Sequence, residues 1–180
     1  MAKMLYSVSM SLDGFIAGAG GDMSWLADFT GPDPTIANLI GDVGSLLVGR
    51  NTYDGDDPNK GTEGEGEAFG GGWSGQQFVL THRIPENSPP DIHFVDDFET
   101  AVAKSKAAAG EKYVNILGAD VARQCVAAGL VDEVLVFLVP VLIGDGVRLF
   151  DHPGGTSIRL ERLSVSEGPE STNLWFRVVR

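Results

Sequence analysis

The sequence predicts an α/β fold with a mixed, mostly parallel central sheet and helices on both of its faces. Short apolar runs suited to strands alternate with helical segments through the first two thirds of the chain, which favours parallel strand pairing. Residues 158–165 and 174–179 then alternate in polarity and are typical of a closing antiparallel hairpin. No repeat or second domain is visible, so we expect residues 1–180 to form one domain.

Each element follows from its local pattern. Before the closing hairpin, the expected strands are residues 4–10, 45–48, 77–81, 92–95, 113–117 and 134–139. The expected helices are residues 35–40, residues 97–109, and a helix that begins after Gly118 and runs to Gly129. Residues 97–109 are rich in good helix formers, and Gly110 ends that pattern.

Residues 55–75 differ from the rest of the chain, because they contain eight glycines and a cluster of aspartates and glutamates. Such a composition is poorly suited to a packed core, so we expect a long, mobile loop. A loop of this kind could form a lid or a wall over a site at the edge of the sheet.

Composition excludes several classes of function. The formal net charge of −12 argues against binding to nucleic acid or to an anionic membrane, since both select basic surfaces. No apolar run approaches the ~20 residues that a membrane-spanning helix needs. The single Cys125 and the absence of a signal-peptide pattern at the N-terminus favour the cytoplasm. The three histidines lack metal-ligand spacing, so we expect no metal site.

Three turns that follow expected strands carry the functional signal: residues 49–52, residues 81–83 and residues 118–121. The first two contain an arginine, whose planar fork of donors suits phosphate, and the third opens a helix, whose amino end favours an anion. Because open α/β sheets bind ligands at the carboxyl ends of their strands, the three turns together favour a phosphate-rich dinucleotide. A Gly-x-Gly-x-x-Gly fingerprint is absent after the first strand.

Longer motifs resemble a known family. They are Ser11-Leu12-Asp13-Gly14-x-Ile16-Ala17, Val48-Gly49-Arg50-x-Thr52-Tyr53, Val79-Leu80-Thr81-His82-Arg83, Leu117-Gly118-Ala119, Leu130-Val131-Asp132-Glu133 and Pro140-Val141-Leu142-Ile143-Gly144-Asp145-Gly146-x-x-Leu149-Phe150. This order is similar to the dihydrofolate reductase-like superfamily, in the branch of the riboflavin-biosynthesis reductase domain and its stand-alone relatives. The resemblance spans residues 6–179.

The resemblance implies a three-layer dihydrofolate reductase-like fold and an NADPH-dependent reductase. It places Gly49, Arg50 and Thr52 at the cofactor phosphates, Thr81, His82 and Arg83 at the adenosine 2′-phosphate, Gly118, Ala119, Asp120 and Val121 around the pyrophosphate, and Ile16 and Ala17 beside the nicotinamide. Residues 36–43 lack the basic residue usual in riboflavin-pathway reductases, which speaks against a phosphoribosyl substrate.

The substrate side is less defined. By the same resemblance, Trp25 matches the tryptophan that precedes a catalytic carboxylate in dihydrofolate reductases, and Asp28 is the nearest candidate for that acid, ahead of Asp33. Asp13 reads as a turn-former that could order the loop over the nicotinamide. Trp73 could meet the substrate or could anchor the glycine-rich loop.

We therefore expect hydride transfer from NADPH to a small planar heterocycle of the pterin or pyrimidine type. Two alternatives stay open: a protein of the same fold that binds a nucleotide or heterocycle without turnover, and a reductase that uses a deazaflavin. Residues 134–142 are expected to be core, with part of the stretch able to contribute to a homodimer.

Overall fold

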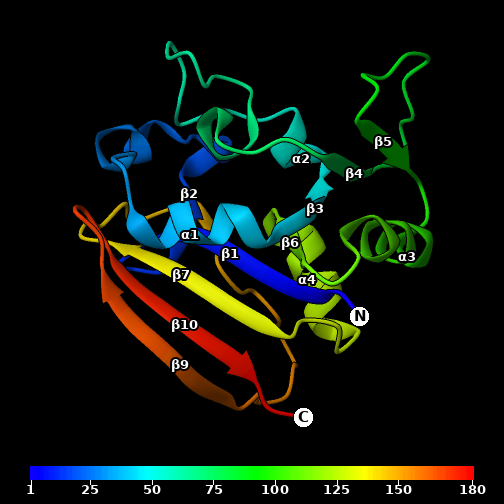
Figure 1. Cartoon of the computed structure of the whole chain (residues 1–180). Coiled ribbons are helices and arrows are strands. Elements are labelled where there is room, and N and C mark those ends of the chain that lie inside the picture. Colours follow the sequence, from blue (N-terminus) through cyan, green and yellow to red (C-terminus); the bar gives the residue numbers. More distant parts are fainter.

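The computed structural model describes all 180 residues, and an eight-stranded sheet of order β5-β4-β3-β6-β1-β7-β10-β9 forms its centre (Figure 1). The strands are β1 (Lys3–Ser11), β3 (Val43–Gly49), β4 (Gln76–Leu80), β5 (Ile92–Val95), β6 (Tyr113–Leu117), β7 (Glu133–Val139), β9 (Leu160–Glu167) and β10 (Thr172–Val178). The strands from β5 to β7 in this order pair in parallel, whereas β10 and β9 add to them antiparallel. The expected mixed, mostly parallel sheet with a C-terminal hairpin is confirmed.

Helices cover both faces of the sheet, as expected. They are α1 (Pro34–Asp42), α2 (Arg50–Tyr53), α3 (Phe98–Ala109) and α4 (Ala119–Ala127), with short 3₁₀ helices η1 (Ala19–Gly21), η2 (Ser24–Phe29) and η3 (Ala68–Gly71). Leu39 of α1 belongs to the core on one face, and Val102 of α3 and Val121 of α4 belong to the core on the other. Even α3, with 12 residues, lacks the length and apolar character that a bilayer-crossing helix requires.

The predicted strands and helices all occur, with ends within two residues of the expected positions. Of the stretch 134–142, residues 134–139 lie inside the sheet between β1 and β10, as expected for the core. Its end is not core, because Pro140 is exposed and Leu142 is 69% exposed in the loop after β7. A second, two-stranded sheet of β2 (Phe15–Ala17) and β8 (Val147–Arg148) was not anticipated. It depends on a contact distant in sequence, because Gly146 packs so closely on the backbone of Ala17 that a Cβ would lie 2.0 Å from that carbonyl oxygen.

The glycine-rich segment 55–75 is a chain of hydrogen-bonded turns rather than an unstructured loop. Asp57 accepts hydrogen bonds from the backbone amides of Asn59 and Gly66, which folds the segment back on itself. Trp73 is 8% exposed, belongs to the core beneath α1, and donates its indole N–H to the Val43 carbonyl at 3.0 Å. Trp73 therefore anchors this segment to the start of β3.

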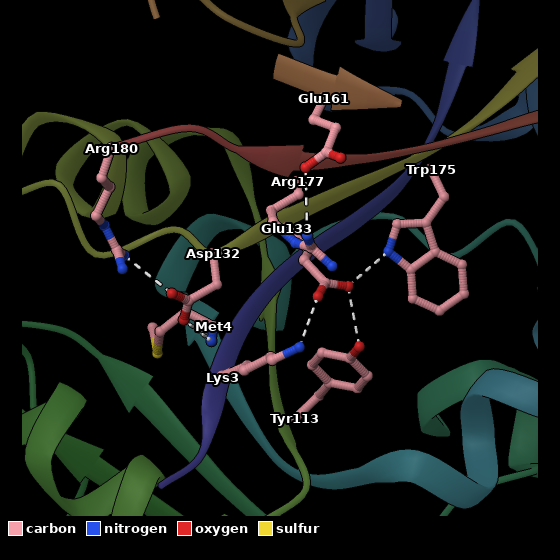
Figure 2. A network of polar contacts seen from close by, with 9 residues as sticks. All are labelled: Lys3, Met4, Tyr113, Asp132, Glu133, Glu161, Trp175, Arg177 and Arg180. Carbon is pink, nitrogen blue, oxygen red and sulfur yellow. Dashed lines mark hydrogen bonds and ion pairs between the residues drawn. The ribbon is translucent and has the colours of Figure 1, made fainter. Parts of the chain in front are cut away.

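A buried carboxylate stabilises the sheet where the parallel strands β1, β6 and β7 begin (Figure 2). Glu133 is 3% exposed, and it accepts hydrogen bonds from Lys3 of β1, Tyr113 of β6 and Trp175 of β10 at 2.8–2.9 Å. Burial and the hydrogen bond to this carboxylate raise the pKa of Tyr113. Glu133 thus joins three strands that are far apart in the sequence.

We predict that Glu133→Gln destabilises the protein by about 2–3 kcal/mol, because the amide loses the Lys3 ion pair and turns an N–H group toward other donors. The free energy of unfolding in urea measures this change. Glu161→Gln is the matched control, since Glu161 pairs with Arg177 where both side chains are more than half exposed, and it should change stability by less than about 1 kcal/mol. Equal effects of the two substitutions would contradict the assignment.

Candidate functional site

A cleft of about 1670 Å³ runs along the carboxyl-terminal edge of the parallel strands. Its volume exceeds the roughly 300–1,000 Å³ typical of pockets for one small ligand, so it has room for a cofactor and a second molecule. All twelve residues expected to bind the cofactor line it: Ile16, Ala17, Gly49, Arg50, Thr52, Thr81, His82, Arg83, Gly118, Ala119, Asp120 and Val121. The structure therefore brings the three turns together in one site.

The cleft has two chemically distinct ends. The arginine end is formed by lining residues in the ranges 48–53, 80–83, 96–98 and 117–124, and it contains Arg50, Arg83 and Arg123. The acidic end is formed by lining residues in the ranges 23–40, 55–70 and 169–171, and it has no arginine or lysine. Lining residues of β1, β2 and β7 lie between the two.

At the arginine end, Arg50 connects the first two turns. Its guanidinium donates a hydrogen bond to the Arg83 carbonyl at 3.3 Å and forms an ion pair with Asp54. The guanidinium carbon also lies 5.8 Å from the ring centroid of Tyr53 and 5.4 Å from that of Phe94, which fixes its plane. Arg50 is thus held in place before any ligand arrives.

Gly118 connects the first turn to the third. Its φ of +105° is in the range that favours glycine, and a Cβ at this position would lie 2.4 Å from the Thr52 hydroxyl. The turn therefore requires glycine, both for its backbone and for its contact with Thr52. Gly118 offers no side-chain cap to α4, so the first amides of this nine-residue helix remain available to an anion.

The second turn leaves one cation without a protein partner. Thr81 is 7% exposed, and its hydroxyl accepts a hydrogen bond from the Arg83 amide at 3.1 Å, which shapes the turn. His82 and Arg83 are exposed, and the Arg83 guanidinium makes no hydrogen bond or ion pair within the protein. Arg123, by comparison, lies 3.5 Å from Asp120 on the same helix.

Asp13 lies outside the lining of the cleft and orders the segments beside it. Its carboxylate accepts hydrogen bonds from the Ser11 hydroxyl at 2.6 Å and from the backbone amides of Ile143 and Gly144. These hydrogen bonds, the Ser11 one foremost, hold its pKa below the ordinary value. Asp13 thereby joins the loop after β1 to the loop after β7, as a turn-former would.

The acidic end is closed by a cluster that we call the Asp33 latch: Asp33, Thr35, Ser171 and Asn173. Asp33 caps α1 by accepting the Thr35 amide at 2.7 Å, and it also accepts hydrogen bonds from Ser171 at 3.2 Å and from Asn173 at 2.9 Å. The latch therefore ties the start of α1 to the turn between β9 and β10, which lie side by side in Figure 1.

Asp33 is 8% exposed and lines the cleft. Burial alone would raise the pKa of its carboxyl group, but the hydrogen bonds from Asn173, Thr35 and Ser171 together lower the pKa below its ordinary value. A carboxylate held ionised in this way acts as a hydrogen-bond acceptor and is a poor source of protons.

The other residues expected to contact substrate do not line the cleft. Asp28 is exposed on η2, and Trp25 on the same helix is half-buried with its indole N–H unpaired. Trp73 lies in the core, where its indole N–H donates to the Val43 carbonyl. It anchors the glycine-rich loop and does not line the cleft. Of the two candidate acids, Asp33, five residues beyond Asp28 in the chain, is the one that lines the cleft.

One polar residue of the cleft floor, Ser7, and its buried partner Asn115 were missed by the sequence patterns. Ser7 of β1 lines the cleft, and its hydroxyl donates to the side-chain oxygen of Asn115 in β6 at 2.8 Å. The available signal was Asn115 itself, a single amide within the apolar strand Tyr113–Leu117. No cluster of three or more His, Cys, Asp or Glu side chains that could hold a metal ion is present.

Comparison with known proteins agrees with this architecture. The uncharacterised protein YyaP of Bacillus subtilis (strain 168) is 26% identical over 156 residues, covering 82% of this chain and 80% of YyaP. A structure from Shewanella sp. PV-4, assigned by name to riboflavin biosynthesis, has a TM-score of 0.76 at 23% identity and covers all of both chains.

RibD of Acinetobacter baumannii has a TM-score of 0.74 at 18% identity, and the match covers all of this chain and 59% of RibD. The family described as the RibD C-terminal domain matches residues 2–117 and 116–174. This chain therefore belongs to the RibD C-terminal domain family.

Proposed function

We propose that the protein is an NADPH-dependent reductase that acts on a small, planar heterocycle of the pterin or pyrimidine type. The observation that carries this proposal is the convergence of three anion-binding turns at one end of a cleft whose other end is acidic. The membership in the RibD C-terminal domain family supports a reductase, since similar structures bear the names of riboflavin-pathway reductases.

The donors at the arginine end fit a dinucleotide phosphate. The amides at the start of α4 and the Thr52 hydroxyl would hold the pyrophosphate, with Gly118 allowing the close approach. Arg83, the cation without a protein partner, would bind the 2′-phosphate. Ile16 and Ala17 would border the nicotinamide, whose C4 supplies the hydride in this class of cofactor.

We predict that the protein binds NADPH more tightly than NADH, and that Arg83→Ala reduces this preference by about tenfold or more because a charge-assisted hydrogen bond to phosphate is lost. Isothermal titration calorimetry with both cofactors measures the change. Arg162→Ala is the control, since Arg162 is an exposed residue of β9 away from the cleft. Equal affinities for the two cofactors in the wild-type protein would refute the assignment of Arg83.

The acidic end favours a substrate without phosphate. Its carboxylates come from Asp33, Asp56, Asp57, Glu67 and Glu170. A phosphate group here would meet several carboxylates, of which only Asp56 has a cation close by, Lys60 at 3.9 Å. The net charge of −12 adds to this repulsion. We therefore propose a neutral or cationic heterocycle that offers hydrogen-bond donors to these acceptors.

We predict that a ribosylaminouracil binds about tenfold more tightly than its 5′-phosphate when the protein is saturated with NADP⁺, because like charges repel the phosphate. The double variant Glu67→Gln/Glu170→Gln should narrow this difference, since both carboxylates are exposed at the acidic end and make no hydrogen bond or ion pair. Glu63→Gln, in the same loop but outside the cleft lining, should leave it unchanged. Tighter binding of the phosphate by the wild-type protein would contradict the proposal.

We also propose a second copy of this chain as a partner, seated on the edge strand β9. Leu160, Leu163 and Val165 of this strand are 38–51% exposed, and an open apolar edge is a site for strand pairing. Residues 157–180 carry four arginines and three glutamates, so this region avoids the negative charge of the rest of the chain. Two copies would therefore meet little charge repulsion at this surface.

Light scattering coupled to size-exclusion chromatography should give the mass of a dimer for the wild-type protein. Leu163→Glu should shift it to a monomer, because a carboxylate would be buried in the contact. Ile84→Glu is the control, since Ile84 is 56% exposed and lies in a loop distant from β9 in the sheet. A monomeric wild-type protein would exclude the dimer.

A further inference from the structure

A polar pair, Ser7 and Asn115, lies at the floor of the cleft, where Ser7 and Ser9 of β1 are lining residues and Asn115 is fully buried beside Ser7. Asn115 is 0% exposed and stands in register with Leu5 of β1 on one side and Leu46 of β3 on the other. Its side-chain oxygen accepts the hydroxyl of Ser7, which is 6% exposed and lines the cleft. The buried Asn115 amide is therefore connected to the cleft through Ser7.

The amide is poorly suited to a purely structural role. Its nitrogen, Nδ2, has no hydrogen-bond partner, and a buried amide group without an acceptor destabilises the folded state. The neighbouring positions on this face hold leucines, and a leucine here would fill the space without leaving a donor unpaired. The unpaired amide thus lowers the stability of the fold, which is typical of residues that serve a site.

The direction of the hydrogen bond decides what Ser7 can offer to a ligand. Because the Ser7 hydroxyl uses its hydrogen on Asn115, its oxygen presents only lone pairs to the cleft. Phe137 and Val139 of β7 also line this middle part of the cleft and give it an apolar surface. Such a surface suits a flat ring whose polar edge reaches the Ser7 oxygen, with the half-buried Ser9 offering a second hydroxyl two residues along β1.

We propose that Ser7 is a specificity residue that accepts a hydrogen bond from a ring N–H of the substrate heterocycle, and that Asn115 is the positioning residue that fixes its hydroxyl. The inference rests on the proposed function and narrows its substrate class to heterocycles with an unsubstituted ring N–H. It agrees with the acidic end, where Asp33 and its neighbours are acceptors as well.

Two fluorescent pteridines test the contact, because lumazine has ring N–H groups and 1,3-dimethyllumazine lacks them. Titrated into the protein with saturating NADP⁺, lumazine should bind the wild-type protein about three- to tenfold more tightly than the dimethyl compound. Ser7→Ala should abolish this preference and leave the affinity for NADP⁺ unchanged. Ser45→Ala should retain the preference, since Ser45 is an equally buried serine that bonds the Ser105 carbonyl outside the cleft.

An unchanged preference in Ser7→Ala would overturn the role of Ser7 while leaving the reductase proposal intact. Failure of the wild-type protein to bind either pteridine would overturn the heterocycle assignment and, with it, this inference. Failure to bind NADP⁺ would overturn the proposed cofactor instead.

Asn115→Leu tests the hydrogen bond alone, because it removes the partner of the Ser7 hydroxyl and leaves Ser7 unchanged. The thermal midpoint should stay the same or rise, since an unpaired amide is replaced by an apolar side chain, while the preference for lumazine narrows about threefold. A fall in the midpoint with an unchanged preference would show that Asn115 serves the fold alone and would overturn its positioning role.

Discussion

Parallel pairing from β5 to β7 brings the carboxyl ends of six strands to one edge of the sheet, and the order of these strands decides which loops meet there. Because β4, β3 and β6 are neighbours, the turns that follow them come into contact through Arg50 and through Gly118. The next strands, β1 and β7, supply the floor of the cleft, and the turn between β10 and β9 supplies its far wall. Strand order thus sets the turns of the arginine end and the β9–β10 turn on opposite sides of β1 and β7.

Preorganisation at the arginine end follows from the same packing. Arg50 is fixed by Asp54 and two aromatic rings, and Thr52 is fixed against Gly118, so these groups need little rearrangement to receive a phosphate. Arg83 is the contrasting case, since its backbone is held by Thr81 while its side chain is free to follow a ligand. A protein of net charge −12 therefore keeps one unpaired guanidinium, that of Arg83, at this end of the cleft.

The features that the sequence predicted are those encoded within a few neighbouring residues. Strand ends followed by Gly49-Arg50-x-Thr52 or by Gly118 are local patterns, and the parallel sheet brings them together whatever the loops do. Contacts between distant residues could not be inferred in this way. The latch joins Asp33 to Asn173 across 140 positions, and nothing near Asp28 or Asp33 indicates which of the two lines the cleft.

The Asp33 latch also bears on how activities could diverge in this fold. Part of the wall of the acidic end comes from the turn of the edge hairpin β9–β10. The turns that form the arginine end follow β4, β3 and β6, on the other side of β1 and β7 in the sheet. Turns at the margin of a sheet tolerate changes in length and composition that interior strands do not. Exchange of Pro169 and Glu170, which line the cleft, is therefore a route by which evolution, or an engineer, could change the acidic end while leaving Gly168 and Ser171 on Asp33.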